Sequence, residues 1–268
     1  MEHDSLEDFT KETTVFDGDS KEVYWAGSGP AVVIMTEMPG ITPAVADFAR
    51  RVVAAGFSVA LPDLFGEAGR PPSPAYVGES LVRGCVSKEF VAFAIGKTSP
   101  IIGWMRQLAA EAHRRSGVGD EVGIGVVGMC FTGGFSLAVA VDPLVAVGVM
   151  SQPSLPLPIG RARQRDLGLD DADRKAVAER AAAGELCAIG LRFTADPLVR
   201  SARFEALREL LGEAFIGVEI DSTSRNAHGY ARNAHSVLTE EYSDQPSPTK
   251  DANDLVIEHM RKHLGLVG

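Results

Sequence analysis

Two kinds of hydrophobic pattern alternate along this chain. The first is a short, almost continuous apolar run, which is typical of a strand covered on both faces. Such runs occur at 31–37 (AVVIMTE), 57–65 (FSVALPDLF), 121–128 (EVGIGVVG), 144–151 (LVAVGVMS), 186–194 (LCAIGLRFT) and 214–221 (AFIGVEID). The second is an amphipathic stretch with helical spacing, at 43–56, 99–115, 203–212 and 251–265.

Buried strands that alternate with helices predict an α/β fold, a three-layer sandwich with a mostly parallel central sheet and helices on both faces. A further short strand is expected at 21–27 and a short helix at 132–142. In such sheets, reactive groups collect on the loops at the carboxyl ends of the strands. Catalytic or binding residues are therefore expected at those ends.

The 268 residues are expected to form one domain, 1–268, because no internal repeat divides them. Two segments depart from the alternating pattern. Residues 66–98 are rich in Gly, Pro and Ser and predict a lid or a partly helical excursion. Residues 151–184 are first proline-rich and then charged, which indicates an insertion or cap segment with one exposed helix.

Charge and composition narrow the function classes. The formal charge is -10, from 36 acidic and 26 basic residues, so a nucleic-acid partner is not expected. The apolar runs are shorter than the roughly 18–20 residues that span a bilayer, and the acidic start does not resemble a secretory signal. A cytoplasmic monomer or small homo-oligomer, with no membrane partner, is predicted. Three cysteines without a CxxC pair argue against a disulfide framework and a zinc site.

The stretch GVVGMCFTGG (125–134) places Cys130 where an apolar run turns abruptly into glycines. A strand that turns sharply into a helix exposes the residue at its apex, and small neighbours permit the turn. The backbone N–H of Phe131 would then face an oxyanion above the sulfur, and the helix dipole would favour the thiolate. The alternative is that Cys130 is a buried packing residue, as most lone cysteines are.

Further polar residues follow other predicted strands. Asp196 lies just past the 186–194 run and could orient a histidine, or could only initiate a turn; Asp221 is the alternative acid. His228 lies in a polar loop directly after the last strand and is the predicted base. His235 is expected instead to cap or pack at the start of a helix.

Glu37 ends a buried strand, where a carboxylate is costly unless it is paired or hydrogen-bonded. A surface position for this side chain is the alternative. The loop that follows would supply a second oxyanion donor, the N–H of Met38. Read in chain order, Cys130, Asp196 and His228 predict a nucleophile, acid and base.

With these motifs, the chain resembles the dienelactone hydrolase family from about Val23 to the C-terminal helix. VVIMTEMPGI, GFSVALPDLFGE, GVVGMCFTGG, RFTADPLV and HGYAR occur in family order. The resemblance implies an α/β-hydrolase with a Cys130, Asp196 and His228 triad, in which Glu37 holds the resting cysteine. It also implies that Arg232, four residues after His228, helps to bind a substrate carboxylate.

The expected activity is hydrolysis of a small lactone or carboxylic ester, without a metal or organic cofactor. Thr132 departs from the family elbow, which usually has glycine there, and the 151–184 segment lengthens the chain beside the expected site. Two alternatives remain open. One is a broad thiol carboxylesterase, and the other is a non-hydrolytic binding or redox-responsive protein that uses Cys130.

Overall fold

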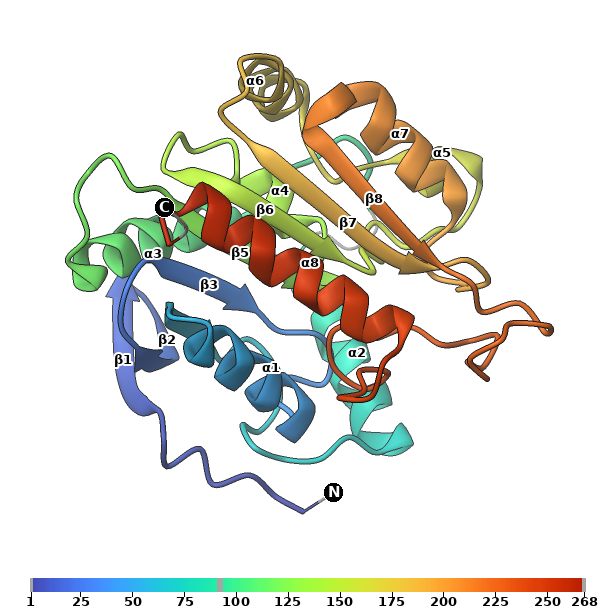
Figure 1. The fold of residues 1–268 in the computed structure, drawn as a ribbon, viewed down its shortest axis with the longest axis horizontal. Coiled ribbons are helices and arrows are strands. Elements are labelled where there is room, and N and C mark those ends of the chain that lie inside the picture. Colours follow the sequence, from blue (N-terminus) through green and yellow to red (C-terminus); the bar gives the residue numbers. More distant parts are fainter. Residues whose placement is uncertain (1, 91–93, 267–268) are drawn as a thin grey trace.

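The computed structural model describes residues 2–90 and 94–266, except for the side chain of Cys85. Its centre is an eight-stranded sheet in the order β1-β2-β4-β3-β5-β6-β7-β8 (Figure 1). Strands β3 to β8 are mutually parallel, while β2 is antiparallel to both β1 and β4. The strands are β1 (Thr10–Phe16), β2 (Asp19–Gly27), β3 (Ala31–Met35), β4 (Ser58–Pro62), β5 (Ile124–Met129), β6 (Val145–Ser151), β7 (Cys187–Phe193) and β8 (Phe215–Ile220).

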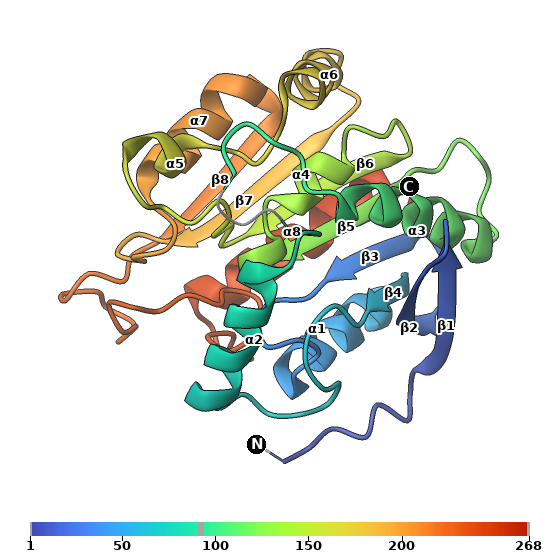
Figure 2. The ribbon, with the colours of Figure 1, turned by 180° about the vertical axis from the view of Figure 1, so that it is seen from behind.

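Helices cover both faces of the sheet, which confirms the predicted three-layer α/β architecture. Helices α1 and α8 pack on one face, and α3, α4, α6 and α7 pack on the other (Figures 1 and 2). The helices are α1 (Pro43–Ala54), α2 (Pro74–Val86), α3 (Ile101–Ser116), α4 (Phe135–Val139), α5 (Arg161–Arg165), α6 (Asp171–Ala182), α7 (Ser201–Leu211) and α8 (Pro248–His263).

Local sequence signals account for several helix starts. Thr42 caps α1 by accepting a hydrogen bond from the N–H of Val45 at 3.3 Å, and Pro43 follows at the first helical position. Ser247 and Pro248 begin α8 in the same way. The excursion at 66–98 contains α2, which begins after Ser73 with the same arrangement.

The order of the strands determines where reactive groups can meet. From β3 the chain passes through α1 to β4 on one side, and then through α2 and α3 to β5 on the other side of β3. This reversal opens a crevice at the carboxyl ends of β3 and β5. Met35 pairs with Gly128 across the two strands, so Glu37 and Cys130 follow neighbouring strand ends.

Strand β1 was not predicted from the sequence. The segment TKETTVF is polar, and only Thr14 within it is buried. Its pairing with β2, from Thr10 opposite Trp25 to Phe16 opposite Asp19, extends the sheet at an edge. An edge strand with little buried surface lacks the apolar run that reveals the central strands.

The 151–184 segment contains α5 and α6, and α6 lies within the helix predicted there. Arg203 of α7, whose side chain is almost fully buried, holds the start of this segment. Its guanidinium donates to the carbonyl oxygens of Pro153 and Pro156, each at 2.6 Å, and of Arg163 at 2.8 Å. The proline-rich loop is therefore tied to the body of the domain.

Asp63 follows β4 with one carboxylate oxygen buried and without a hydrogen-bond partner among the described residues. Burial raises the pKa of Asp63 to about 6 from the ordinary value of 3.8. Because the native state then holds a proton that the unfolded chain releases, stability falls as the pH rises between these two values.

Replacing Asp63 with asparagine should remove this pH-dependent cost. We expect Asp63→Asn to gain stability relative to the wild type as the pH rises from about 4 to about 7, by about 2 kcal/mol once partial solvent screening is allowed for. Urea unfolding at a series of pH values measures this difference. A difference that stays constant with pH would contradict the expectation.

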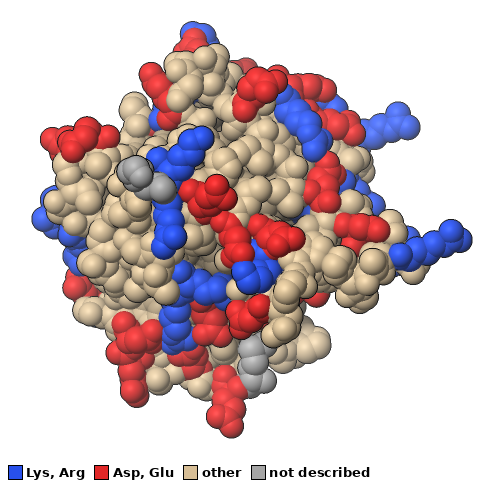
Figure 3. Space-filling view, in the orientation of Figure 1, with Lys and Arg blue, Asp and Glu red and all other residues tan. Residues whose placement is uncertain are grey.

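The surface bears charges of both signs. On the face shown in Figure 3, Lys and Arg side chains are interspersed with Asp and Glu. No helix among the described residues is both long enough and apolar enough to cross a membrane.

Candidate active site

Cys130 lies at the apex of a sharp turn between β5 and a short 3₁₀ helix, Cys130–Thr132. Its φ of 51° is in the left-handed region, which a non-glycine residue rarely adopts. The glycines around it are needed, because a Cβ on Gly128 would lie 2.2 Å from the carbonyl oxygen of Thr132. One on Gly133 would lie 2.5 Å from the Cα of Pro153. The turn therefore has the backbone features of a nucleophile elbow.

Thr132, the departure from the family pattern, is explained by its hydroxyl. Thr132 Oγ1 accepts a hydrogen bond from the N–H of Met129 at 3.0 Å. The same oxygen lies 2.9 Å from the carbonyl oxygen of Met35 and 3.1 Å from that of Thr36. This fully buried hydroxyl thus connects the elbow to the end of β3, a contact that glycine could not make.

Thr132→Val should destabilise the protein by about 1–3 kcal/mol, because the side chain keeps its shape but leaves the buried N–H of Met129 without an acceptor. The free energy of unfolding in urea measures this loss. Thr132→Ser is the matched control, since it keeps the hydroxyl and should lose less stability. Equal stability of the valine variant and the wild type would contradict this role.

Asp196 is paired with His235. The carboxylate follows β7, is 1% exposed, and its Oδ2 lies 2.6 Å from Nδ1 of His235. Its other oxygen accepts the N–H of Leu198 at 2.8 Å, which fixes the carboxylate. A buried carboxylate on Nδ1 orients the imidazole and leaves Nε2 for chemistry. Nε2 of His235 is buried and has no hydrogen-bond partner among the described residues.

The structure corrects the predicted partner of Asp196, because the paired histidine is His235 and not His228. His228 is exposed at the tip of a turn that the Asn226 side chain organises by accepting the N–H groups of His228 and Tyr230. Asp221 is also exposed, and its carboxylate accepts a hydrogen bond from the N–H of Thr223. No histidine among the described residues forms a hydrogen bond or ion pair with it.

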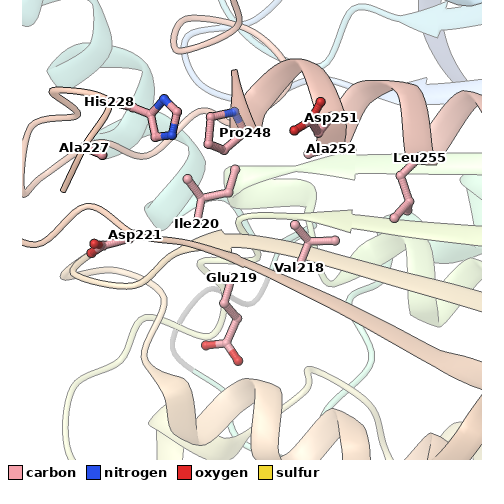
Figure 4. Close-up of a pocket in the computed structure, with 10 residues that line it drawn as sticks. All are labelled: Val218, Glu219, Ile220, Asp221, Ala227, His228, Pro248, Asp251, Ala252 and Leu255. Carbon is pink, nitrogen blue, oxygen red and sulfur yellow. The ribbon is translucent and has the colours of Figure 1, made fainter. Parts of the chain in front are cut away.

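His228 lines a different hollow of the surface. This cavity, of about 490 Å³, lies between the edge strand β8 and the start of α8. Figure 4 shows His228 beside Pro248, with Asp221 at the end of β8 and Asp251 and Leu255 along α8. Cys130, Asp196 and His235 do not line it.

Charge at the site favours a protonated His235. Burial lowers the pKa of His235, but the neighbouring Cys130 and Asp196 raise it, and the net result lies well above the ordinary value of 6.5. These two neighbours therefore favour the protonated form of the ring. A protonated imidazole is the partner that stabilises a thiolate.

Glu37 is buried, as predicted, with 3% of its surface exposed. Three hydrogen bonds stabilise its carboxylate. Ser236 donates to its Oε2 at 2.6 Å, Gln152 donates to the same oxygen at 3.1 Å, and Thr239 donates to Oε1. No hydrogen bond joins Glu37 to Cys130 in the described part of the chain. The carboxylate therefore anchors the loop that carries the paired histidine to the end of β3.

The sulfur of Cys130 has a different neighbour. Ser154 Oγ lies 3.6 Å from Cys130 Sγ, and the N–H of Ser154 donates to the Cys130 carbonyl at 2.9 Å. Gln152 joins the same region to the histidine loop by accepting the N–H of Val237 at 3.3 Å. Sequence reasoning missed Gln152 and Ser154. The available signal was their position directly after β6, the strand beside β5.

The two residues predicted to supply oxyanion donors, Phe131 and Met38, both lie beside helix α2. The N–H of Phe131 has no acceptor within its own short helix, because it precedes the first intrahelical bond. Met38 follows β3, and its side chain and that of Phe131 both face Gly84 of α2. A Cβ at Gly84 would lie 2.4 Å from Met38 Cε and 3.3 Å from Phe131 Cζ. Helix α2 thus packs against both residues.

Arg232 is exposed in the same loop as His235 and makes no hydrogen bond or ion pair with the described residues. Its expected role in substrate binding was counted from His228. Counted from His235, the fourth following residue is Thr239, which binds Glu37. The positional argument for Arg232 therefore no longer holds, although Arg232 lies only three residues before the paired histidine.

Comparisons with known proteins agree with this fold. A model of the dienelactone hydrolase family matches residues 18–264. A Klebsiella pneumoniae structure assigned as a dienelactone hydrolase has a TM-score of 0.61 and 15% identity, covering 96% of this chain and 98% of that chain. A dienelactone hydrolase-like promiscuous phosphotriesterase from metagenomic libraries has the same four values.

A cold-adapted esterase from an Arctic intertidal metagenomic library has a TM-score of 0.57 and 14% identity, covering 98% of this chain and all of that chain, 100%. A comparison with curated proteins found no match. The structural similarities support the fold, while the family model covers most of the chain. The protein therefore belongs to the dienelactone hydrolase family and has the α/β-hydrolase fold.

Proposed function

We propose that this protein hydrolyses small carboxylic esters or lactones through a Cys130, His235 and Asp196 triad. The observation that supports this most strongly is the 2.6 Å pair between buried Asp196 and His235, next to a cysteine in a left-handed elbow. His235 replaces His228 in the predicted triad. The order nucleophile, acid, base along the chain is unchanged.

In the first half of the reaction, the Cys130 thiolate attacks the carbonyl carbon and the carbonyl π electrons move onto oxygen. The N–H groups of Phe131 and Met38 are the proposed donors to that oxyanion. When the tetrahedral intermediate collapses, the C–O bond breaks and His235 gives its Nε2 proton to the departing alkoxide. In a lactone, this alkoxide remains part of the acyl group.

In the second half, neutral His235 removes a proton from water, and the resulting hydroxide attacks the thioester. The thiolate leaves, the acid is released and the imidazolium is restored. Asp196 keeps the ring oriented throughout and stabilises its charged form. Glu37 acts as a positioning residue, because it holds Ser236 and Thr239, which directly follow His235 in the same loop.

The test of this function is turnover of p-nitrophenyl acetate, a dienelactone and a phosphotriester by the purified protein. Hydrolysis of either of the first two supports the proposal. Rapid alkylation of Cys130 without turnover of any substrate would contradict it and would favour the binding or redox-responsive alternative.

Arg232 distinguishes a carboxylate-directed lactonase from a broad esterase. We propose that its exposed guanidinium, which has no partner among the described residues, binds a carboxylate of the substrate. Arg232→Ala should then raise KM for a carboxylate-bearing lactone by about tenfold and leave neutral esters unchanged. An equal effect on both substrates, or none, would contradict this role and favour the broad esterase. Arg225→Ala, in the same loop, is the matched control.

A further inference from the structure

Cys187, His259 and His263 form a second cluster of chemically active side chains. Cys187 is the first residue of β7, whereas Cys130 follows the last residue of the parallel strand β5. The cluster therefore lies at the amino-terminal ends of the parallel strands, whereas the candidate active site lies at their carboxyl ends. Figure 1 shows the C-terminal end of α8 on the side of the sheet where β7 begins.

The three side chains converge. Sγ of Cys187 lies 3.7 Å from Nδ1 of His259, and one ligand atom from each of the three residues lies within 4.8 Å of the others. His259 and His263 are four residues apart on α8, so they project from the same side of the helix. Their rings are stacked with centroids 6.1 Å apart and planes inclined by 15°.

A zinc centre sets definite distances between its ligand atoms. With a Zn–S bond of about 2.3 Å and Zn–N bonds of about 2.0–2.1 Å, tetrahedral geometry places sulfur about 3.5 Å from nitrogen and the two nitrogens about 3.3 Å apart. The Cys187–His259 distance is already close to this value. His263 is exposed in the last turn of α8, where its side chain can rotate to complete the site.

We propose that Cys187, His259 and His263 bind a zinc ion, with water in the fourth position. When the metal–sulfur bond forms, the Cys187 thiol releases its proton to solvent, and no electrons are transferred. Thiolate and imidazole are the ligands that zinc prefers. The partial negative charge of the C-terminal end of α8 favours a cation there, while Lys262 opposes it.

A zinc ion bound at this site would link the C-terminal helix α8 to strand β7 of the sheet. Its ligands come from a strand and a helix, and Cys187 and His259 are 72 positions apart, so no short motif reveals it. The sequence prediction of no zinc site considered only closely spaced cysteines. Because a ligand that binds only the native state stabilises it, zinc should raise the unfolding temperature.

The experiment uses the metal-free full-length chain carrying Cys85→Ser and Cys130→Ser, so that Cys187 is the only thiol. Titration with Co²⁺ should give a thiolate-to-cobalt charge-transfer band that saturates at one equivalent, and Zn²⁺ should displace the Co²⁺. His259→Ala and His263→Ala should each weaken binding by more than about tenfold and reduce the rise in unfolding temperature with Zn²⁺. His3→Ala, another exposed histidine, should leave both unchanged.

Replacing Cys187 with serine should abolish the band. Because Cys187 is buried and its loss could impair folding, the exposed His263 provides the decisive variant. The proposal is overturned if no band forms, or if His263→Ala binds Co²⁺ as tightly as the parent. These readouts do not involve ester hydrolysis, so they are independent of the proposed activity.

Discussion

Replacing His235 with glutamine should lower kcat/KM for p-nitrophenyl acetate by about 10³-fold or more. The glutamine can still hydrogen-bond to Asp196, but it cannot carry the proton that the thiolate requires or deliver it to the leaving group. The loss should be mainly in kcat, because the ring is proposed to act on the reacting atoms and not in ground-state binding.

The matched control is His228→Gln, the same substitution seven residues earlier in the same loop. His228 is exposed, and Asp196 is hydrogen-bonded to His235 instead, so this variant should keep kcat/KM within about threefold of the wild type. The reverse result, loss in the His228 variant and activity in the His235 variant, would restore the assignment made from the sequence. Circular dichroism of both variants checks that they are folded.

Replacing Cys130 with alanine should reduce ester hydrolysis to the background rate, a loss of about 10⁴-fold or more, because the covalent route then has no nucleophile. Cys130→Ser tests the same point with a smaller change. Its hydroxyl is far less acidic than a thiol, so an imidazolium that supports a thiolate does not generate an alkoxide. The serine variant should therefore retain little activity.

The control for Cys130 is Cys187→Ala, which removes a buried thiol at the opposite end of the parallel strands. At a temperature where this variant is folded, its kcat should equal that of the wild type. Undiminished hydrolysis by the Cys130 variants would exclude the proposed nucleophile.

Much of the fold could be predicted from the sequence because its signals are local. The central strands are continuous apolar runs, and helices α1 and α8 carry their own caps, so each element is visible without knowledge of its neighbours. The elbow is also local, since Gly128, Cys130 and Gly133 lie within a few residues. Strand β1 was not predicted, because its place at the edge of the sheet leaves most of its side chains exposed.

The histidine that pairs with Asp196, which is the proposed base, could not be identified in the same way. His228 and His235 lie in one long loop after β8, and nothing in the neighbouring residues shows which of them reaches Asp196. That choice depends on contacts between distant segments: Ser236 and Thr239 bind Glu37, some 200 positions earlier. His228 was preferred because it lies in the polar loop directly after the last strand, and the resemblance of HGYAR to the family agreed with that choice.

For Glu37 and Thr132, the sequence indicated where the residue lies in the fold but not which groups it is hydrogen-bonded to. A buried carboxylate at the end of β3 was expected, but its oxygens bind two hydroxyls and an amide instead of the cysteine. Thr132 looked like an irregularity in the elbow and instead supplies the hydroxyl that joins two strand ends. Hydrogen-bond partners are set by tertiary packing, which a single sequence does not display.

The most direct test of the proposed catalysis is to titrate ester hydrolysis against alkylation of Cys130. Samples treated with increasing amounts of iodoacetamide are assayed on p-nitrophenyl acetate, and peptide mass spectrometry measures the modified fraction of each cysteine. Activity should fall linearly to the background rate as the modified fraction of Cys130 approaches one, and saturating ester should slow the modification. Full hydrolysis by protein whose Cys130 is completely alkylated would contradict the proposed mechanism.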